Sequence, residues 1–200
     1  MTRCCSYAPR LQRFQLFGHL FAAVGGVGHR LDRHPTMSRH PVTPMAERVE
    51  RLCAGLEQAH AEGAAMSEFP TTMAAARAAH ERGLLTVMGG PNVVRGGSHS
   101  GNVAAADLAR AGLLDILSSD YVPGSLLSAV MRLVQDEVLT LPQAVATVTR
   151  NPARASGMAD RGELATGLRA DLVQVHMAEL PCGGHQAVVR GVWREGQRVL

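Results

Sequence analysis

Hydrophobic positions along the chain follow two patterns, a helical spacing and short continuous apolar runs. From residue 45, "MAERVERLCAGLEQAHAEG" predicts a helix that Gly63 ends. Its apolar face would hold Val49, Leu52, Leu56 and Ala59. The same spacing predicts helices over residues 70–83, 103–112, 123–137 and 140–157. Short apolar runs predict strands at about residues 64–69, 84–88 and 115–119.

Strands and helices therefore alternate through the middle of the chain. This alternation is typical of βα units around a parallel sheet. Residues 46–157 are expected to form that α/β region. Residues 158–200 are expected to form a small β unit, because "ADLVQVHM" and "AVVRGVWREGQRVL" are rich in strand formers and Gly196 suits a hairpin turn. Residues 1–45 show no lasting period and are expected to form a divergent, disordered leader.

Composition narrows the classes of function. All 20 basic residues are Arg, so chemistry that needs a Lys, such as a Schiff base, is excluded. The arginines are scattered, which argues against nucleic acid as a partner. Four cysteines without metal-finger spacing favour a reducing, cytoplasmic location. The apolar run over residues 14–28 is too short and too polar to cross a membrane, so no membrane partner is expected.

Two carboxylates fall at the C-terminal ends of predicted strands, where parallel sheets bind ligands. Asp120 follows the third strand. A carboxylate there can ligate a divalent metal or act as the base toward a metal-bound water, or it can cap a helix. Glu68 ends the first strand and can face a ligand, with a capping or ion-paired carboxylate as the alternative.

The glycine-rich stretch "GGPNVVRGGSHSGN" follows the second predicted strand. Glycines let the backbone approach a ligand, Arg95 supplies a charged fork, and His99 can exchange a proton near neutral pH. These properties suit an anion, above all phosphate, although no Walker motif occurs. The alternative is a long surface turn. The phosphate-binding candidates are Arg95, Gly96, Gly97, Ser98, Ser100 and Asn102, together with Glu68.

Four motifs carry a resemblance to a known family. "SEFPTT", "PNVVRGGSHSGN", "LLDILSSDYVP" and "NPARASGMADRGELATGLRADLV" resemble the phosphonate-metabolism diphosphatases of the amidohydrolase superfamily, over about residues 55–200. The resemblance implies a (β/α)8 barrel hydrolase that uses zinc, manganese or magnesium and releases pyrophosphate from a phosphorylated ribose phosphonate. It further implies that Asp120 binds the metal and orients the attacking water. His99 would bind substrate or protonate the leaving group.

The sequence also departs from that family. No His-x-His pair occurs, and 200 residues fall short of the roughly 250 that a complete barrel needs. The expected fold class is therefore α/β: a truncated (β/α)8 barrel of amidohydrolase type, with its last strands only and a small C-terminal β unit. Its edge strands are expected to be unpaired. A complementing N-terminal half or a homo-oligomer is the expected partner; the alternatives are a non-catalytic remnant or an anion- or nucleotide-binding α/β module.

Overall fold

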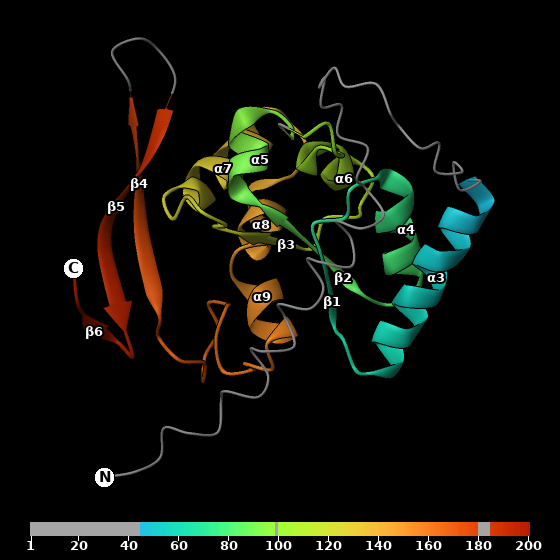
Figure 1. Ribbon diagram of the computed structural model, residues 1–200. Helices are drawn as coiled ribbons and strands as arrows, with labels where there is room; N and C mark the ends of the chain where they lie inside the picture. Colours follow the sequence, from blue (N-terminus) through green and yellow to red (C-terminus); the bar gives the residue numbers. More distant parts are fainter. Residues whose placement is uncertain (1–44, 99, 180–184) are drawn as a thin grey trace.

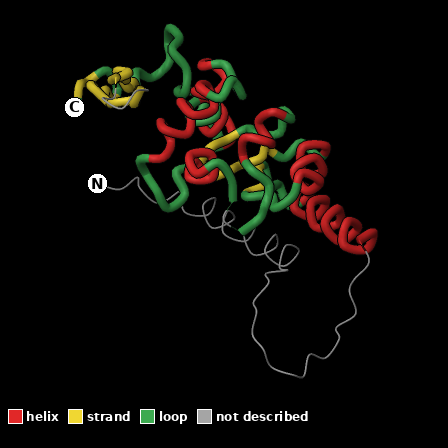
Figure 2. The backbone as a smooth tube through the Cα atoms, turned by 90° about the horizontal axis from the view of Figure 1, so that it is seen from above, coloured by secondary structure: helices red, strands yellow, loops and turns green. Residues whose placement is uncertain are grey.

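The computed structural model describes residues 45–98, 100–179 and 185–200 (Figure 1). All of the predicted leader except Met45 lies outside this range, and so does His99. The described chain forms an α/β part and a separate C-terminal sheet. Seen from above in Figure 2, the helices of the α/β part surround its strands, and the second sheet lies to one side.

The sheet of the α/β part has three parallel strands in the order β1-β2-β3. These strands are β1 (Met66–Glu68), β2 (Leu85–Gly89) and β3 (Ile116–Ser118). Ser67 pairs with Thr86, and Val87 pairs with Ile116, which confirms the predicted parallel arrangement. The Asp115 carboxylate accepts a hydrogen bond from the Thr86 N–H at 2.8 Å, just before β3 begins.

Part of the outer edge of β3 is covered by the chain itself. The Leu117 N–H donates to the Thr147 carbonyl at 3.0 Å. One turn later, the Asn151 side-chain amide donates to the Asp115 carbonyl at 2.8 Å. Among the described residues no further strand pairs with β3, which stays an edge strand as expected, but residues 147–151 cover part of its outer side through these two bonds.

One helix precedes the first strand, and the others lie between and after the strands. Thr72 caps the second helix by accepting a hydrogen bond from the Ala75 N–H at 3.1 Å. In the described part of the chain, no helix is both long and apolar enough to cross a membrane. The helices are α3 (Met45–Ala61), α4 (Met73–Glu81), α5 (Gly90–Arg95), α6 (Ala105–Arg110), α7 (Ser125–Gln135), α8 (Leu141–Ala146) and α9 (Arg150–Ala155).

Two helical segments differ from prediction. Residues 90–95 are expected to be loop, yet they form α5. Residues 140–157 are expected to form one helix, yet they form α8 and α9. The two helices are separated by residues 147–149. Thr147 keeps helical backbone angles and its carbonyl accepts from β3, whereas Thr149, with φ of −128° and ψ of −86°, leaves the helical conformation.

Small apolar side chains form the core of the α/β part. The main cluster joins β2 and β3 to the helices, and Leu108, Ala129 and Leu133 are among its most buried members. A second cluster packs Leu56 of α3 against Ala79 of α4. Because aromatic residues make up only 4% of the sequence, this core depends on close contact between Ala, Leu and Val.

The C-terminal sheet is antiparallel, in the order β4-β5-β6. Its strands are β4 (Leu172–Glu179), β5 (His185–Arg194) and β6 (Gln197–Arg198). Glu195 and Gly196, with φ of 52° and 79°, form the turn between β5 and β6. Two consecutive residues with positive φ match a tight hairpin turn and confirm the turn predicted at Gly196. Assignment of residues 158–200 to a separate domain stays a prediction.

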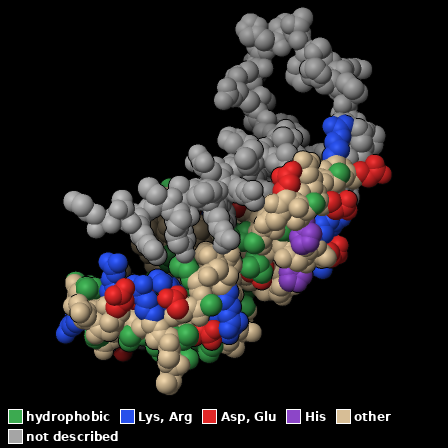
Figure 3. Space-filling view, turned by 90° about the horizontal axis from the view of Figure 1, so that it is seen from below, with side chains coloured by type: hydrophobic (Ala, Val, Ile, Leu, Met, Phe, Trp, Pro, Cys, Tyr) green, Lys and Arg blue, Asp and Glu red, His purple; other side chains and the backbone are tan. Residues whose placement is uncertain are grey.

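Charged side chains tie the segment after α9 to this hairpin. Arg169 donates to Asp171 at 3.0 Å and pairs with Glu195 at 3.0 Å. The Glu195 N–H donates to the same Asp171 carboxylate at 2.9 Å. On the face drawn in Figure 3, acidic and basic side chains lie side by side. Ion pairs and backbone bonds thus hold an end of the molecule that has few buried side chains.

Candidate active site

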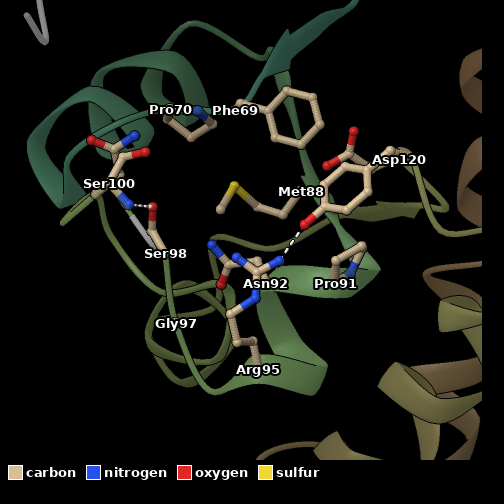
Figure 4. A pocket seen from close by; sticks show the side chains of 13 residues that line it. Phe69, Pro70, Met88, Pro91, Asn92, Arg95, Gly97, Ser98, Ser100 and Asp120 are labelled. Atoms are coloured by element: carbon tan, nitrogen blue, oxygen red, sulfur yellow. Dashed lines mark hydrogen bonds between the residues drawn. The ribbon is translucent and has the colours of Figure 1, made fainter.

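A pocket of about 180 Å³ lies at the C-terminal ends of the parallel strands (Figure 4). Its walls come from the ends of β1 and β2, from α5 with the loop after it, and from residues just after β3. Open α/β sheets bind ligands at this edge. The polar side chains that line the pocket are Asn92, Arg95, Ser98, Ser100, Asn102 and Asp120, and the apolar ones include Phe69, Pro70, Met88 and Pro91.

Gly89 is the last residue of β2, and because it has no side chain, the side chains of Phe69 and Asp120 can lie close to the strand end. A Cβ atom at this position would lie 3.0 Å from Asp120 Oδ2 and 3.3 Å from Phe69 Cε1. Phe69 and Asp120 both have positive φ, 52° and 50°. Such a backbone conformation costs a residue other than glycine about 1–3 kcal/mol. The surrounding structure therefore holds both residues against this cost, and the ends of three strands converge at Gly89.

Helix α5 brings two of the polar side chains to the pocket. Pro91 lies in its first turn, and Gly96, with φ of 82°, ends it. Arg95 is the last helical residue, so its side chain starts from a fixed backbone rather than from a flexible loop. The Asn92 side-chain carbonyl accepts a hydrogen bond from the Ala105 N–H at 2.8 Å and ties α5 to the start of α6.

Arg95 and Asp120, which follow different strands in the sequence, line the same pocket. The Arg95 Nη2 atom donates a hydrogen bond to the hydroxyl of Tyr121 (Figure 4). That bond joins α5 to the residue directly after Asp120. A cationic group and a carboxylate are thereby placed on two walls of one cavity.

The other candidates from the glycine-rich stretch do not all line the pocket. Gly97, Ser98, Ser100 and Asn102 line the pocket. Gly96 lies outside the lining and instead ends α5. The Ser100 N–H donates to the Ser98 hydroxyl at 3.1 Å, which shapes this rim of the pocket. The predicted catalytic role of His99 concerns a residue outside the described range.

Glu68 lies at the end of β1, near Asp120 but outside the pocket lining. Its partial burial raises the pKa of the Glu68 carboxyl above its ordinary value, and the negative charge of Asp120 raises it further. Glu68 therefore keeps its proton to a higher pH than an ordinary glutamate. The negative charge of Asp120, which follows β3, thus acts on Glu68 at the end of β1, with β2 between the two strands.

Several pocket residues are absent from the sequence-based candidates. Some of them directly follow a candidate carboxylate, as Phe69 follows Glu68 and Tyr121 follows Asp120. Others lie in the first turn of α5, as Asn92 does, and the sequence did not predict that helix. The first group could have been found by listing the residues next to each strand end, whatever their polarity; the second could not. These residues are Phe69, Pro70, Met88, Pro91, Asn92 and Tyr121.

The sequence matches a known family over most of its length, since residues 28–200 fit the amidohydrolase family. The chain belongs to the amidohydrolase family. With the parallel βα sheet, this match confirms the predicted fold class, a partial α/β barrel of amidohydrolase type.

Individual proteins resemble this amidohydrolase to different extents. The alpha-D-ribose 1-methylphosphonate 5-triphosphate diphosphatase of Escherichia coli (strain K12) is 51% identical over 149 residues, which are 74% of this chain and 38% of that protein. The 3-oxo-isoapionate kinase of Paraburkholderia graminis is 78% identical over 45 residues, 22% of this chain and 10% of that protein. A crystal structure of an adenine deaminase matches with a TM-score of 0.41 and 17% identity, over 63% of this chain and 38% of that one. The first similarity confirms the resemblance to the phosphonate diphosphatases, although this amidohydrolase chain spans only 38% of that relative's length.

A divalent metal, which the family resemblance implies, is not matched by the described donor set. Asp120 and Glu68 supply two neighbouring carboxylates. Protein metal sites usually have three or more protein ligands. Among the described residues, no group of three or more His, Cys, Asp or Glu side chains is arranged to hold a metal. These residues alone therefore do not fit the metal, and the role of Asp120 as a ligand stays a prediction.

Proposed function

We propose that this chain carries the polyphosphate-binding part of a hydrolase that releases pyrophosphate from alpha-D-ribose 1-methylphosphonate 5-triphosphate. The observation that carries the proposal is the placement of Arg95 and Asp120 on one pocket, in a chain 51% identical to a protein named for that reaction. In the reaction, water displaces pyrophosphate. The bond between the first phosphorus and the oxygen that bridges it to the second breaks, and a 5-phosphate remains on the ribose.

The polar wall of the pocket has the chemistry of an anion site. Arg95 offers a planar guanidinium, which suits phosphate oxygens better than a point charge does. Ser98, Ser100 and Asn102 add neutral hydrogen-bond donors on the same wall. Each charge-assisted hydrogen bond contributes about 1.5–3 kcal/mol. A phosphate chain bound here would therefore be held mainly by Arg95.

The pocket is large enough to enclose part of the substrate but not the whole of it. Pockets that enclose a complete small-molecule ligand usually have volumes of about 300–1,000 Å³. This pocket, at about 180 Å³, is smaller. We therefore place the phosphates inside it and the ribose and phosphonate beyond it.

Asp120 and Glu68 would act on the opposite side of the phosphates from Arg95. An ionised Asp120 can accept the proton of the attacking water. Glu68 can donate a hydrogen bond to a phosphate oxygen only in the fraction of molecules in which it holds its proton. His99 remains the proposed donor of a proton to the leaving pyrophosphate. We further propose that metal ligands come from a complementing N-terminal half or from a second copy of the chain, with zinc, manganese or magnesium as the ion.

Pyrophosphate release by the full chain tests this proposal. The chain is incubated with the triphosphate substrate and manganese, zinc or magnesium, and pyrophosphate is measured with a coupled enzyme assay. Release should fall by about 10- to 100-fold in Arg95→Ala, the loss that one charge-assisted contact represents, and it should be abolished in Asp120→Asn. Arg110→Ala is the matched control, because Arg110 is an exposed arginine whose partner is Asp107 on the same helix. Equal losses in Arg95→Ala and Arg110→Ala would contradict the proposed site.

A second function, anion binding without turnover, is favoured by the shortage of metal ligands among the described residues. One experiment, which compares anion binding with pyrophosphate release, distinguishes the two functions. A chain that binds inorganic pyrophosphate through Arg95 but releases none from the substrate, with any of the three metals, supports binding alone. If addition of an N-terminal half of the relative restored pyrophosphate release, that result would support the hydrolase proposal instead.

A further inference from the structure

Tyr121 directly follows the candidate carboxylate Asp120, and both lie in the turn formed by residues 119–122. The Val122 N–H donates to the Ser119 carbonyl at 3.0 Å and closes this turn. Asp120 takes the left-handed backbone conformation within it. The turn is short and internally bonded, so the place from which the Tyr121 ring projects is defined by the backbone.

The Tyr121 side chain reaches across the pocket rather than into the core. Its residue is 62% exposed, although the ring forms part of the pocket wall. Its hydroxyl accepts the hydrogen bond from Arg95 Nη2, as drawn in Figure 4. Packing does not require a large aromatic residue at so exposed a position. The contact with Arg95 is the interaction that its placement makes possible.

The chemistry of this pair matches the recognition of an anion. A guanidinium is planar with donors in a fixed fork, so one hydrogen bond restricts the plane in which the group lies. A phenol oxygen can accept a bond from Arg95 and at the same time donate its own O–H to a second acceptor. A phosphate oxygen in the pocket would be such an acceptor.

We propose that Tyr121 is a positioning residue for phosphate binding: it orients the Arg95 guanidinium and donates its hydroxyl to the same phosphate group. This inference rests on the proposed function, because it assumes that the pocket binds phosphates. It adds to Arg95 a second side chain, which comes from the turn after β3 rather than from α5. Because the two groups contact each other, one phosphate in the pocket can bind both.

The Tyr121→Phe substitution tests the hydroxyl, because it keeps the ring and removes only the oxygen. Binding of inorganic pyrophosphate and of inorganic phosphate to the full chain is measured by calorimetry. Binding of both anions should weaken about tenfold in Tyr121→Phe and further in Arg95→Ala. Because Tyr121 acts partly through Arg95, the loss of affinity in the double variant should be smaller than the two single losses combined.

A second measurement observes the tyrosine in the unsubstituted chain. The sequence has two tyrosines, Tyr7 and Tyr121, so fluorotyrosine labelling yields two fluorine resonances that Tyr7→Phe assigns. Addition of pyrophosphate should shift the Tyr121 resonance, and the shift should be lost in Arg95→Ala. A role limited to packing would produce neither this shift nor the coupling in the double variant.

The outcomes separate the two proposals. Wild-type affinity in Tyr121→Phe, with weakened binding in Arg95→Ala, overturns the role of Tyr121 and leaves the pocket assignment intact. A resonance that does not move when pyrophosphate binds overturns it equally. Failure of the wild-type chain to bind pyrophosphate overturns both the pocket assignment and the inference built on it.

Discussion

The α/β part and the C-terminal sheet are stabilised by different interactions. In the α/β part, Leu108 and Leu133 are at most 1% exposed within a continuous apolar cluster. In the C-terminal sheet, Val173 is 57% exposed, and the ion pair between Arg169 and Glu195 joins the hairpin to the preceding segment. Burial therefore holds the first part, and charges with backbone pairing hold the second. Because the pocket lies in the first part, its geometry depends on packing.

The largest difference between the two parts should come from deleting apolar side chains. Leu133→Ala is expected to lower the free energy of unfolding by about 2–5 kcal/mol, because it removes a fully buried side chain and leaves a cavity. Val173→Ala, in exposed β4, should change it by less than about 0.5 kcal/mol. Urea unfolding followed by circular dichroism measures both. Equal losses would show that β4 is buried against something else in solution.

A next, smaller effect should come from adding one methyl group at the convergence of the strands. Gly89→Ala places a Cβ atom 3.0 Å from Asp120 Oδ2 and should displace Asp120 and Phe69. The expected loss of stability is about 1–3 kcal/mol, together with weaker binding of pyrophosphate. Gly124→Ala is the control, because its φ is −74° and no atom lies within 4 Å of the added Cβ. Urea unfolding and calorimetry are carried out on both variants. Equal stability and equal pyrophosphate binding in the two would contradict the convergence at Gly89.

The raised pKa of Glu68 predicts a modest pH effect in the α/β part. Above its raised pKa the carboxyl is ionised beside Asp120 and partly buried, which destabilises the fold. Glu68→Gln should therefore be more stable than wild type at neutral pH. The advantage should shrink as pH falls through the raised pKa and disappear below the ordinary value of 4.5. Urea midpoints across this pH range measure it; a pH-independent difference would refute it.

The smallest effect, of opposite sign, is expected at Asp171 in the C-terminal part. The Glu195 N–H and the Arg169 side chain, which both donate to this carboxylate, lower its pKa below 3.8. Its ionised form therefore adds stability above that value, and this contribution is lost as pH falls through the lowered pKa. Asp171→Asn should be less stable than wild type at neutral pH, with the two converging in acid. The same urea series measures it, and salt should reduce the difference.

Secondary structure was predictable where local pattern decides it. Apolar runs indicated all three parallel strands within a few residues, and Gly196 indicated the hairpin turn. The α5 helix was not predicted, because Gly89, Gly90 and Gly96 together favour a loop by composition. In the structure Gly90 lies so close to Ser125 of α7 that a Cβ atom would be 2.7 Å from its hydroxyl. That glycine serves helix packing, which composition cannot distinguish from loop flexibility.

The candidate site shows the same division. Strand ends alone indicated Asp120 and Arg95, because parallel strands of one sheet end at the same edge. They did not indicate that Tyr121 would bond to Arg95, since the two are 26 residues apart and meet only when α5 and the turn after β3 are in place.

The sequence by itself determined the alternation of strands and helices, the family, and the edge of the sheet at which polar groups gather. The tertiary structure decided three things: the partial covering of β3 by residues 147–151, the convergence of Phe69 and Asp120 on Gly89, and the pairing of Arg95 with Tyr121. The physical reason is range. Periodicity and turn chemistry act between residues a few positions apart, whereas these contacts depend on how separate elements pack.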